Sequence, residues 1–327
     1  VNGFASYSKA GDDDTMLWHA GQSWFVGSAA NLGQDRGLVR VRDGCLRPEA
    51  STVAWQVYDG TAFVNAPELR CLAGDALAAE IAKAAPQIAL VGPTPQNARV
   101  EWLGVFLKRD ELTNGYSSYT KAGDDGAMLW HAGGCWIIGA AADLGQTRGW
   151  VSLRDGCVRP EASTVKWRVL DGTAFVNAPE LRCLAGDALA AEIAKAAPQI
   201  ALVGPTPQNL LTDKLGVFLK RDELINGYPS YTKAGADGAM LWHAGECWTV
   251  GVAADLGQAR GVVSLVDGCL RPEASTVAWR VYNGAEWIDA PELRCLAGRP
   301  STSRRIWDPD AGRWLDAGRL MVFEDGD

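Results

Sequence analysis

The sequence predicts a mainly β protein made of three tandem antiparallel β-meander modules joined by short helical linkers. The chain repeats itself at an offset of 112 residues, as at Asn2, Asn114 and Asn226. Within each copy, fixed positions alternate with variable ones, which is the period of a strand with one buried face. Glycines and Asp-Gly pairs separate the alternating runs at turn positions.

The repeat runs through the chain without a gap. Leu-Trp-His-Ala-Gly occurs at residues 17–21, 129–133 and 241–245, and residues 59–97 are identical to residues 171–209. Because this identity includes a linker, it indicates recent duplication rather than a functional site. Repetition of this kind is typical of proteins that stack one structural unit.

The repeat divides the chain into six segments. Module 1 spans residues 1–74, module 2 spans 103–186 and module 3 spans 215–298. Residues 75–102 and 187–214 are linkers with a helical part and a Pro-rich part. Residues 299–327 are expected to form a C-terminal hairpin around Asp-Pro-Asp and a closing strand.

The alternation predicts six strands in module 2. They are expected at residues 104–108, near Tyr119, and at 127–131, 135–139, 149–154 and 164–170, with a short segment at 175–176 closing the unit. Nine recurring tryptophans are predicted to form the module cores: Trp18, Trp24, Trp55, Trp130, Trp136, Trp167, Trp242, Trp248 and Trp279.

Each linker is predicted to contain a helix. Asp187 can cap a helix from Ala188 to about Ala197, and Pro198 then ends it. The apolar side chains of this helix lie four apart on one face, so the helix should dock on a module. The apolar run Gln199–Val203 is a candidate short strand.

Module 1 has no counterpart of the first strand of the other modules. Residues 320–323 match 103–106 and 215–218, so residues 320–327 are a candidate for that strand. Closure within one chain would protect an open sheet edge. The alternative is a longer array, in which the last strand belongs to a neighbour or is exchanged between chains.

The eight cysteines fall in register with the repeat. The simplest interpretation is one disulfide in each copy: Cys45–Cys71, Cys157–Cys183 and Cys269–Cys295. Cys135 and Cys247 are then free or paired between modules. Such bridges would each stabilise by about 3–4 kcal/mol and favour a secreted, extracellular or other oxidising lumenal location. The alternative is eight reduced thiols.

No metal or cofactor is predicted. Each copy has one histidine and two cysteines, but no pair has zinc-ligand spacing. The acidic residues 12–14 and 124–125 resemble part of a calcium loop, yet the third copy has Ala236-Asp237 at this place. They are therefore interpreted as solvated turns.

Four residues are candidates for a ligand-binding surface: His19, His131, His243 and Trp150. Each histidine follows a tryptophan on a strand, so the two side chains should point to opposite faces. Trp150 has aliphatic counterparts in the other copies, which makes it the more exposed aromatic. A flat indole face with polar neighbours suits a sugar ring. Core packing is the competing interpretation of the recurring tryptophans.

Charge and motifs argue against several function classes. The net charge is −8 with scattered lysine and arginine, so a nucleic-acid partner is not expected. No apolar run is long enough to span a membrane. Known hydrolase, metalloprotease and nucleotide-binding motifs are absent from the sequence. Cys135 and His131 lack a third group to orient them, so a hydrolase is the remotest hypothesis.

Residues 226–281 best preserve one pattern: Asn-Gly-Tyr-Pro-x-Tyr, Met-Leu-Trp, Cys-Trp-x-Val-Gly, Leu-Gly-Gln-x-Arg-Gly, Arg-Pro-Glu-Ala and Trp-Arg-Val. This pattern resembles a Trp- and Gly-rich module repeated in large predicted proteins of unicellular algae. Pro229 fits the pattern, whereas Ala5 and Ser117 depart from it. The resemblance implies a repeat module and implies no activity or catalytic residue.

Together these observations predict a non-enzymatic repeat protein. It would be a structural or adhesive component, or an assembly scaffold, acting through multivalent module surfaces. Its partners would be other proteins of a larger assembly or of an extracellular matrix. The second hypothesis is a lectin-like glycan binder with up to three sites.

Overall fold

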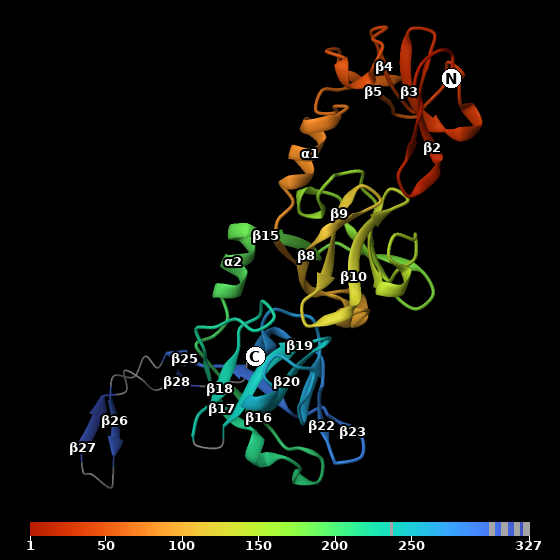
Figure 1. Ribbon diagram of the computed structural model, residues 1–327. Coiled ribbons are helices and arrows are strands. Elements are labelled where there is room, and N and C mark those ends of the chain that lie inside the picture. The colour runs from red at the N-terminus through yellow and green to blue at the C-terminus, as the bar shows by residue number, and fades with distance from the viewer. Residues whose placement is uncertain (236–237, 301–304, 309–312, 317–320, 323–327) are drawn as a thin grey trace.

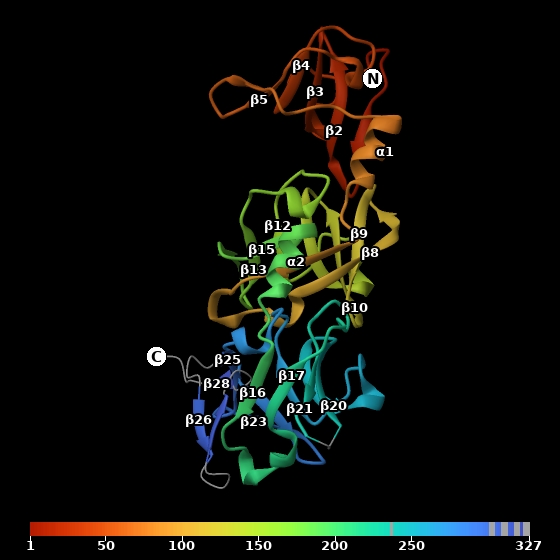
Figure 2. The same ribbon diagram turned by 90° about the vertical axis from the view of Figure 1, so that its left-hand side faces the viewer.

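Three antiparallel sheets dominate the protein, which confirms the mainly β class (Figure 1). The computed structural model describes residues 1–235, 238–300, 305–308, 313–316 and 321–322. The sheets follow one another along the long axis in both views, with module 1 at one end and module 3 at the other (Figures 1 and 2). The described modules therefore form a string rather than a ring.

The first sheet is a six-stranded meander whose strands are neighbours in sequence order. Its strands are β1 (Tyr7–Lys9), β2 (Asp12–Ala20), β3 (Ser23–Ser28), β4 (Val39–Arg42), β5 (Trp55–Tyr58) and β6 (Phe63–Ala66).

The second sheet has nine strands, in the order β14-β13-β12-β11-β10-β9-β8-β7-β15. They are β7 (Gln87–Val91), β8 (Gly104–Thr113), β9 (Tyr116–Lys121), β10 (Asp124–Ala132), β11 (Cys135–Ala140), β12 (Val151–Leu153), β13 (Trp167–Leu170), β14 (Phe175–Ala178) and β15 (Arg182–Ala185). The last strand of the module therefore crosses to the opposite edge of the sheet and pairs with the first.

The third sheet has the same strand order, β23-β22-β21-β20-β19-β18-β17-β16-β24. Its strands are β16 (Gln199–Val203), β17 (Gly216–Lys220), β18 (Tyr231–Lys233), β19 (Ala239–Ala244), β20 (Cys247–Val252), β21 (Val263–Val266), β22 (Trp279–Tyr282), β23 (Trp287–Ala290) and β24 (Arg294–Ala297).

Two strands lie in segments that the repeat assigns to linkers. The candidate strand Gln199–Val203 is β16, and its counterpart Gln87–Val91 is β7. Both are hydrogen-bonded on two sides: β7 to β8 and β15, and β16 to β17 and β24. The second and third sheets therefore each begin inside a linker, because a buried apolar run is stable only with backbone partners on both edges.

The linker helices are α1 (Gly74–Ala82) and α2 (Gly186–Ala194), so each begins and ends earlier than predicted. Ala185 occupies the N-cap of α2 without a side-chain bond, and Asp187 lies in the first turn, where a carboxylate favours the positive end of the helix. Residues after Ala194 leave the helix, and the Ala197 amide donates to Glu273 Oε1 at 3.1 Å.

Short 3₁₀ helices connect several strands: η1 (Ala29–Asn31), η2 (Pro48–Ala50), η3 (Pro95–Asn97), η4 (Val100–Trp102), η5 (Ala141–Asp143), η6 (Pro160–Ala162), η7 (Pro207–Asn209), η8 (Thr212–Lys214), η9 (Ala253–Asp255) and η10 (Pro272–Ala274).

The C-terminal segment contains two small pairs of strands. The expected hairpin is present as β26 (Arg305–Asp308) paired with β27 (Arg313–Asp316). The segment proposed to close module 1 contributes β28 (Met321–Val322), which pairs with β25 (Arg299–Pro300) rather than with the first sheet. Residues 320 and 323–327 of that predicted closing strand lie outside the described residues.

Tryptophans pack on both faces of each sheet. All nine predicted core tryptophans are buried. Trp136 and Trp167 belong to the main core of module 2, whereas Trp130 packs with Ala132 and Ile137 in a separate cluster. Module 2 therefore has two separate clusters, because Trp130 and Trp136 come from opposite faces of the same sheet.

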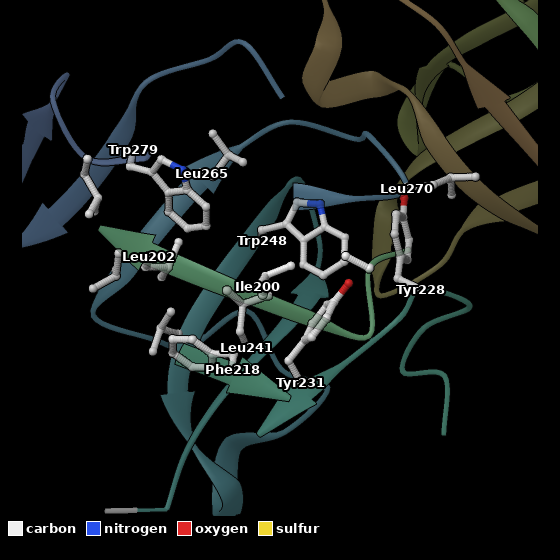
Figure 3. Close-up of a cluster of buried hydrophobic side chains, with 14 of the residues drawn as sticks. Ile200, Leu202, Phe218, Tyr228, Tyr231, Leu241, Trp248, Leu265, Leu270 and Trp279 are labelled. Carbon is white, nitrogen blue, oxygen red and sulfur yellow. The ribbon is translucent and has the colours of Figure 1, made fainter. Parts of the chain in front are cut away.

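The main core of module 3 is the largest cluster in the described chain. Trp248, Tyr228 and Tyr231 lie close together, and Ile200 and Phe218 belong to the same cluster (Figure 3). The cluster also includes Ala89 and Val91 of β7, Val105 of β8 and Ala122 of the β9–β10 turn. Apolar packing therefore runs without interruption from module 2 into module 3.

The two helices provide a matched test of docking, since their sequences are identical. Leu189 in α2 is 4% exposed and packs in the module 3 core, whereas its counterpart Leu77 in α1 is 38% exposed. Leu189→Ala should lower the free energy of unfolding by about 2–4 kcal/mol, because it leaves a cavity. Leu77→Ala should cost less than about 1 kcal/mol, because its side chain is largely solvated.

Urea denaturation of the full chain, followed by tryptophan fluorescence, measures both effects. If Leu189→Ala and Leu77→Ala lower the free energy of unfolding equally, α2 is no better packed than α1.

Candidate functional site

The three candidate histidines lie inside the modules and not on a ligand-binding surface. His19, His131 and His243 are all buried. Tryptophan and histidine do point to opposite faces as expected, but both faces are covered. The histidine side joins the main core because His131 pairs across the sheet with Trp136.

An aromatic ring covers each histidine. Tyr116 stacks on His131 with ring centroids 3.9 Å apart, and Tyr228 stacks on His243 at 3.8 Å. On the other side Trp136 meets the His131 ring edge to face, at 5.4 Å. In module 1, Phe4 takes the tyrosine's place over His19 at 3.7 Å. The histidine is therefore a packing residue within an aromatic cluster.

Burial changes the acid–base behaviour of these imidazoles. It lowers the pKa of His131 from 6.5 to about 4, against the opposing effect of a hydrogen bond between Nε2 and the Asp155 carbonyl. It also lowers the pKa of His243 well below 6.5. Both rings are thus neutral at physiological pH and offer no cation to a ligand.

The Asn-Gly pair before each stacking ring has a role that turn formation alone does not explain. Asn114 Nδ2 donates to His131 O at 3.0 Å and to Gly145 O at 2.9 Å. Asn226 makes the equivalent bonds to His243 O at 2.9 Å and Gly257 O at 3.0 Å.

The asparagine therefore ties the start of each module to two of its loops. Sequence reasoning missed this role because Asn-Gly already had an explanation as a turn. The signal was the recurrence of the asparagine in all three copies, including Asn2, which bonds to His19 O and Gly33 O.

Trp150 is half-buried rather than fully exposed. Its ring stacks on Trp102 with centroids 4.0 Å apart and planes at 22°. One face of the indole is therefore already occupied by an aromatic neighbour. This leaves less of the ring to serve as a platform for a sugar.

The predicted disulfides are not formed in the structure, where all eight cysteines are free thiols. The Cys157 thiol donates to Arg159 O at 3.0 Å, and the Cys269 thiol donates to Arg271 O at 3.1 Å. Both thiols thus have a partner other than the predicted one. The argument for an oxidising compartment, which depended on bridges, loses this support.

The described residues contain no group of three or more histidine, cysteine or acidic side chains arranged to hold a metal ion. The acidic turn of module 1 is held by its own bonds, since Asp12 accepts from the Asp14 amide at 3.2 Å and the Thr15 hydroxyl at 2.8 Å. Within the described chain, no helix has the length and apolarity to cross a membrane.

The junctions between modules use the same backbone contact twice. The Gly133 amide of module 2 donates to Gly11 O in the β1–β2 turn of module 1, at 3.0 Å. The Gly245 amide of module 3 donates to Gly123 O in the β9–β10 turn of module 2, also at 3.0 Å. Each hairpin tip therefore contacts the His-Ala-Gly segment of the following module.

The helices repeat an ion pair with the module that follows them. Glu80 of α1 lies 3.6 Å from Arg159, and Glu192 of α2 lies 3.5 Å from Arg271. These pairs are partly exposed, so they contribute to orientation more than to stability.

The junction of modules 2 and 3 is the tighter one. The Tyr228 hydroxyl accepts from the Val105 amide at 2.8 Å, and the Gly268 amide donates to Val100 O at 3.0 Å. Lys121 is also buried there and donates to Glu101 O. Burial lowers its pKa to about 8, although the nearby Asp124 and Glu246 carboxylates favour the charged form.

A cavity of about 340 Å³ lies at this junction, with Asn97, Arg182, Glu192, Arg271 and Thr276 in its wall. Its size is within the range of small-molecule sites. Arg271 and Glu192 pair with each other at 3.5 Å. Asp267 and Cys269 also line the wall, and the Cys269 thiol donates to Arg271 O at 3.1 Å. Burial raises the pKa of this thiol well above 9.0, so it is protonated at neutral pH and is a poor nucleophile.

The buried histidines predict a pH dependence of stability. Because the pKa of His131 falls from 6.5 to about 4 on folding, the unfolded chain binds the extra proton between these pH values. The stability from the neutral ring is complete above pH 6.5 and is lost as the pH falls toward 4. The free energy of unfolding should fall by at most about 1.4 kcal/mol for each pH unit in this range.

Urea denaturation at pH 7, 6 and 5 checks this slope, with His131→Gln as the matched variant that cannot titrate. The variant should lose less stability than the native chain between pH 6 and 5. Identical losses would show that His131 is accessible to protons in the folded state.

The free thiols predict how many cysteines react with Ellman's reagent and how fast one of them reacts. Without reductant, the unfolded chain should react with Ellman's reagent at all eight cysteines. In the folded chain Cys157 should react slowly at pH 8, because burial raises its pKa to about 11 and about one thiol in a thousand is ionised. If only two cysteines react in the unfolded chain, the other six form the three predicted disulfides.

No family model, curated protein or solved structure matches this chain. Its function is therefore inferred from the chemistry and geometry of its own residues.

Proposed function

We propose that this chain is a non-enzymatic scaffold, a structural component that holds repeated module surfaces in line for multivalent contact with other proteins. The observation that carries the proposal is the repeated junction, in which the same glycine amide and glycine carbonyl join modules 1 and 2 and modules 2 and 3. A contact repeated along the chain favours a defined spacing of modules over independent domains.

The location of the recurring polar residues supports the same proposal. The recurring asparagines, together with His131 and His243, bond within their own modules. Core tryptophans do the same; for example, Trp130 Nε1 donates to Gln146 O and Trp242 Nε1 to Gln258 O. Packing within each module therefore explains why these residues recur in the three copies. What remains to interact with a partner is the outer surface, presented up to three times.

A glycine at the junction allows a sharp test of rigidity. A Cβ on Gly123 would come within 2.7 Å of Asn226 Nδ2, an amide already held by two hydrogen bonds. Gly123→Ala should therefore separate modules 2 and 3. Gly235, at the corresponding tip in module 3, has a positive φ too, but nothing lies within 4 Å of an added Cβ. Gly235→Ala thus controls for backbone strain alone.

Small-angle scattering and limited proteolysis of the full chain provide the readout. Gly123→Ala should broaden the distance distribution and speed cleavage between residues 204 and 214, whereas Gly235→Ala should change neither. If both variants behave like the native chain, the junction does not hold the modules in line.

A glycan array, combined with tryptophan fluorescence during sugar titration, separates the scaffold from the lectin hypothesis. The scaffold predicts no saturable response in either measurement. A saturable response to one class of glycan would contradict the proposal and favour a lectin.

A further inference from the structure

The cavity of about 340 Å³ between modules 2 and 3 is assembled from segments that are far apart in the chain. The segment from β7 through η4 provides one wall, and β15 and α2 each contribute one charged side chain. The loop between β21 and β22 of module 3 provides the facing wall. The cavity therefore exists only while the two modules hold the arrangement seen in Figures 1 and 2.

Buried aliphatic side chains form much of the wall. They come from both modules: Leu90, Val100, Leu103 and Leu270. Figure 3 shows Leu270 beside the ribbon of module 2. These side chains offer a ligand no hydrogen bond, so the part of a ligand that they contact must itself be apolar.

The two carboxylates in the wall already have partners. Glu192 Oε1 lies 3.5 Å from Arg271 Nη2, and Glu192 Oε2 accepts from Lys195 Nζ at 2.7 Å. Asp267 Oδ1 accepts from a backbone amide at 2.9 Å, and its Oδ2 accepts from the Ser275 hydroxyl at 2.5 Å. Each of the four carboxylate oxygens thus has a donor from the protein.

The side-chain groups that are left for a ligand are donors. Within the part of the chain that the structure describes, the Arg182 side chain in the wall has no ion pair and no hydrogen bond. Its guanidinium carries five N–H groups and a permanent positive charge. Asn97 Oδ1 accepts from the Thr276 hydroxyl at 3.3 Å, so its Nδ2 can donate elsewhere. A ligand held here must therefore present acceptors to these groups.

We propose that this cavity binds a small carboxylate with an apolar tail. The tail would lie against the buried aliphatic side chains, and the carboxylate would accept charge-assisted hydrogen bonds from Arg182 and a further bond from Asn97. A volume of 340 Å³ equals that of about eleven water molecules at about 30 Å³ each. Octanoate, with about ten non-hydrogen atoms, is therefore a suitable probe.

Binding would also stabilise the junction. Because both modules line the cavity, the complete site is available only in the assembled arrangement. A ligand that binds only this arrangement shifts the equilibrium toward it by mass action. This effect on module spacing rests on the scaffold proposed above, whereas the binding itself does not.

Isothermal titration calorimetry of the full chain with octanoate tests the site. The expected result is one saturable site per chain, filled below about 10 mM, because about ten ligand atoms of ordinary efficiency can supply millimolar affinity. Octanamide has the same tail without the charge and should bind at least tenfold more weakly. Acetate has the charge without the tail and should give no saturable heat.

Two protein variants locate the binding. Arg182→Gln should leave stability unchanged, because its exposed side chain has no partner within the described residues, and should weaken octanoate binding at least tenfold. The control is Arg70→Gln. It changes the arginine of the identical segment Leu-Arg-Cys-Leu-Ala at residues 69–73, which is not part of the cavity wall. Its octanoate affinity should stay within twofold of the native value.

Limited proteolysis measures the effect on the junction. Octanoate should slow cleavage between residues 204 and 214, and Arg182→Gln should remove this protection. Binding without protection would contradict the coupling to the junction while supporting the site.

Three results would overturn the site itself. They are the absence of saturable binding, an affinity for octanamide equal to that for octanoate, and an octanoate affinity that Arg182→Gln lowers no more than Arg70→Gln does. None of them bears on the Gly123→Ala test, so a failure of this proposal and a failure of the scaffold remain distinguishable.

Discussion

The pairing of β7 with β15, and of β16 with β24, is the constraint on which the architecture depends. It joins the first strand of a module to its last, so the apolar face between them is covered and both strands gain backbone partners. The first strand also follows the linker helix, and a glutamate of that helix pairs with an arginine of the module that follows. Module closure therefore comes from these strand pairs, whereas the glycine contacts between one module and the next set the spacing.

The recurring residues serve this construction. The stack of Tyr116, His131 and Trp136 fills the core where the module begins, and Asn114 fixes the approach of the chain to it. A neutral histidine suits this place because its ring packs like an aromatic while one nitrogen bonds to a backbone carbonyl. Module 1 keeps the same stack with Phe4, although its sheet is smaller.

Much of the fold follows from sequence reasoning. Period-two alternation predicts the strands from β8 to β14 to within a few residues, and the apolar run Gln199–Val203 predicts β16. Sequence reasoning was less successful for the candidate site. It placed His131 on a surface, because alternation shows that two side chains face opposite ways but not that both faces are covered. It paired cysteines by register, which cannot show where a thiol points.

The repeat, the β class and the burial of the tryptophans can all be predicted from the amino-acid sequence. Which segments belong to which sheet becomes clear only in the folded chain. Residues 59–97 and 171–209 make the reason plain, since they are identical. Leu-Arg-Cys-Leu-Ala is a strand where β7 lies beside it and is irregular where no such strand is present. A strand's backbone bonds are made to a distant segment, so its own sequence cannot settle whether it forms.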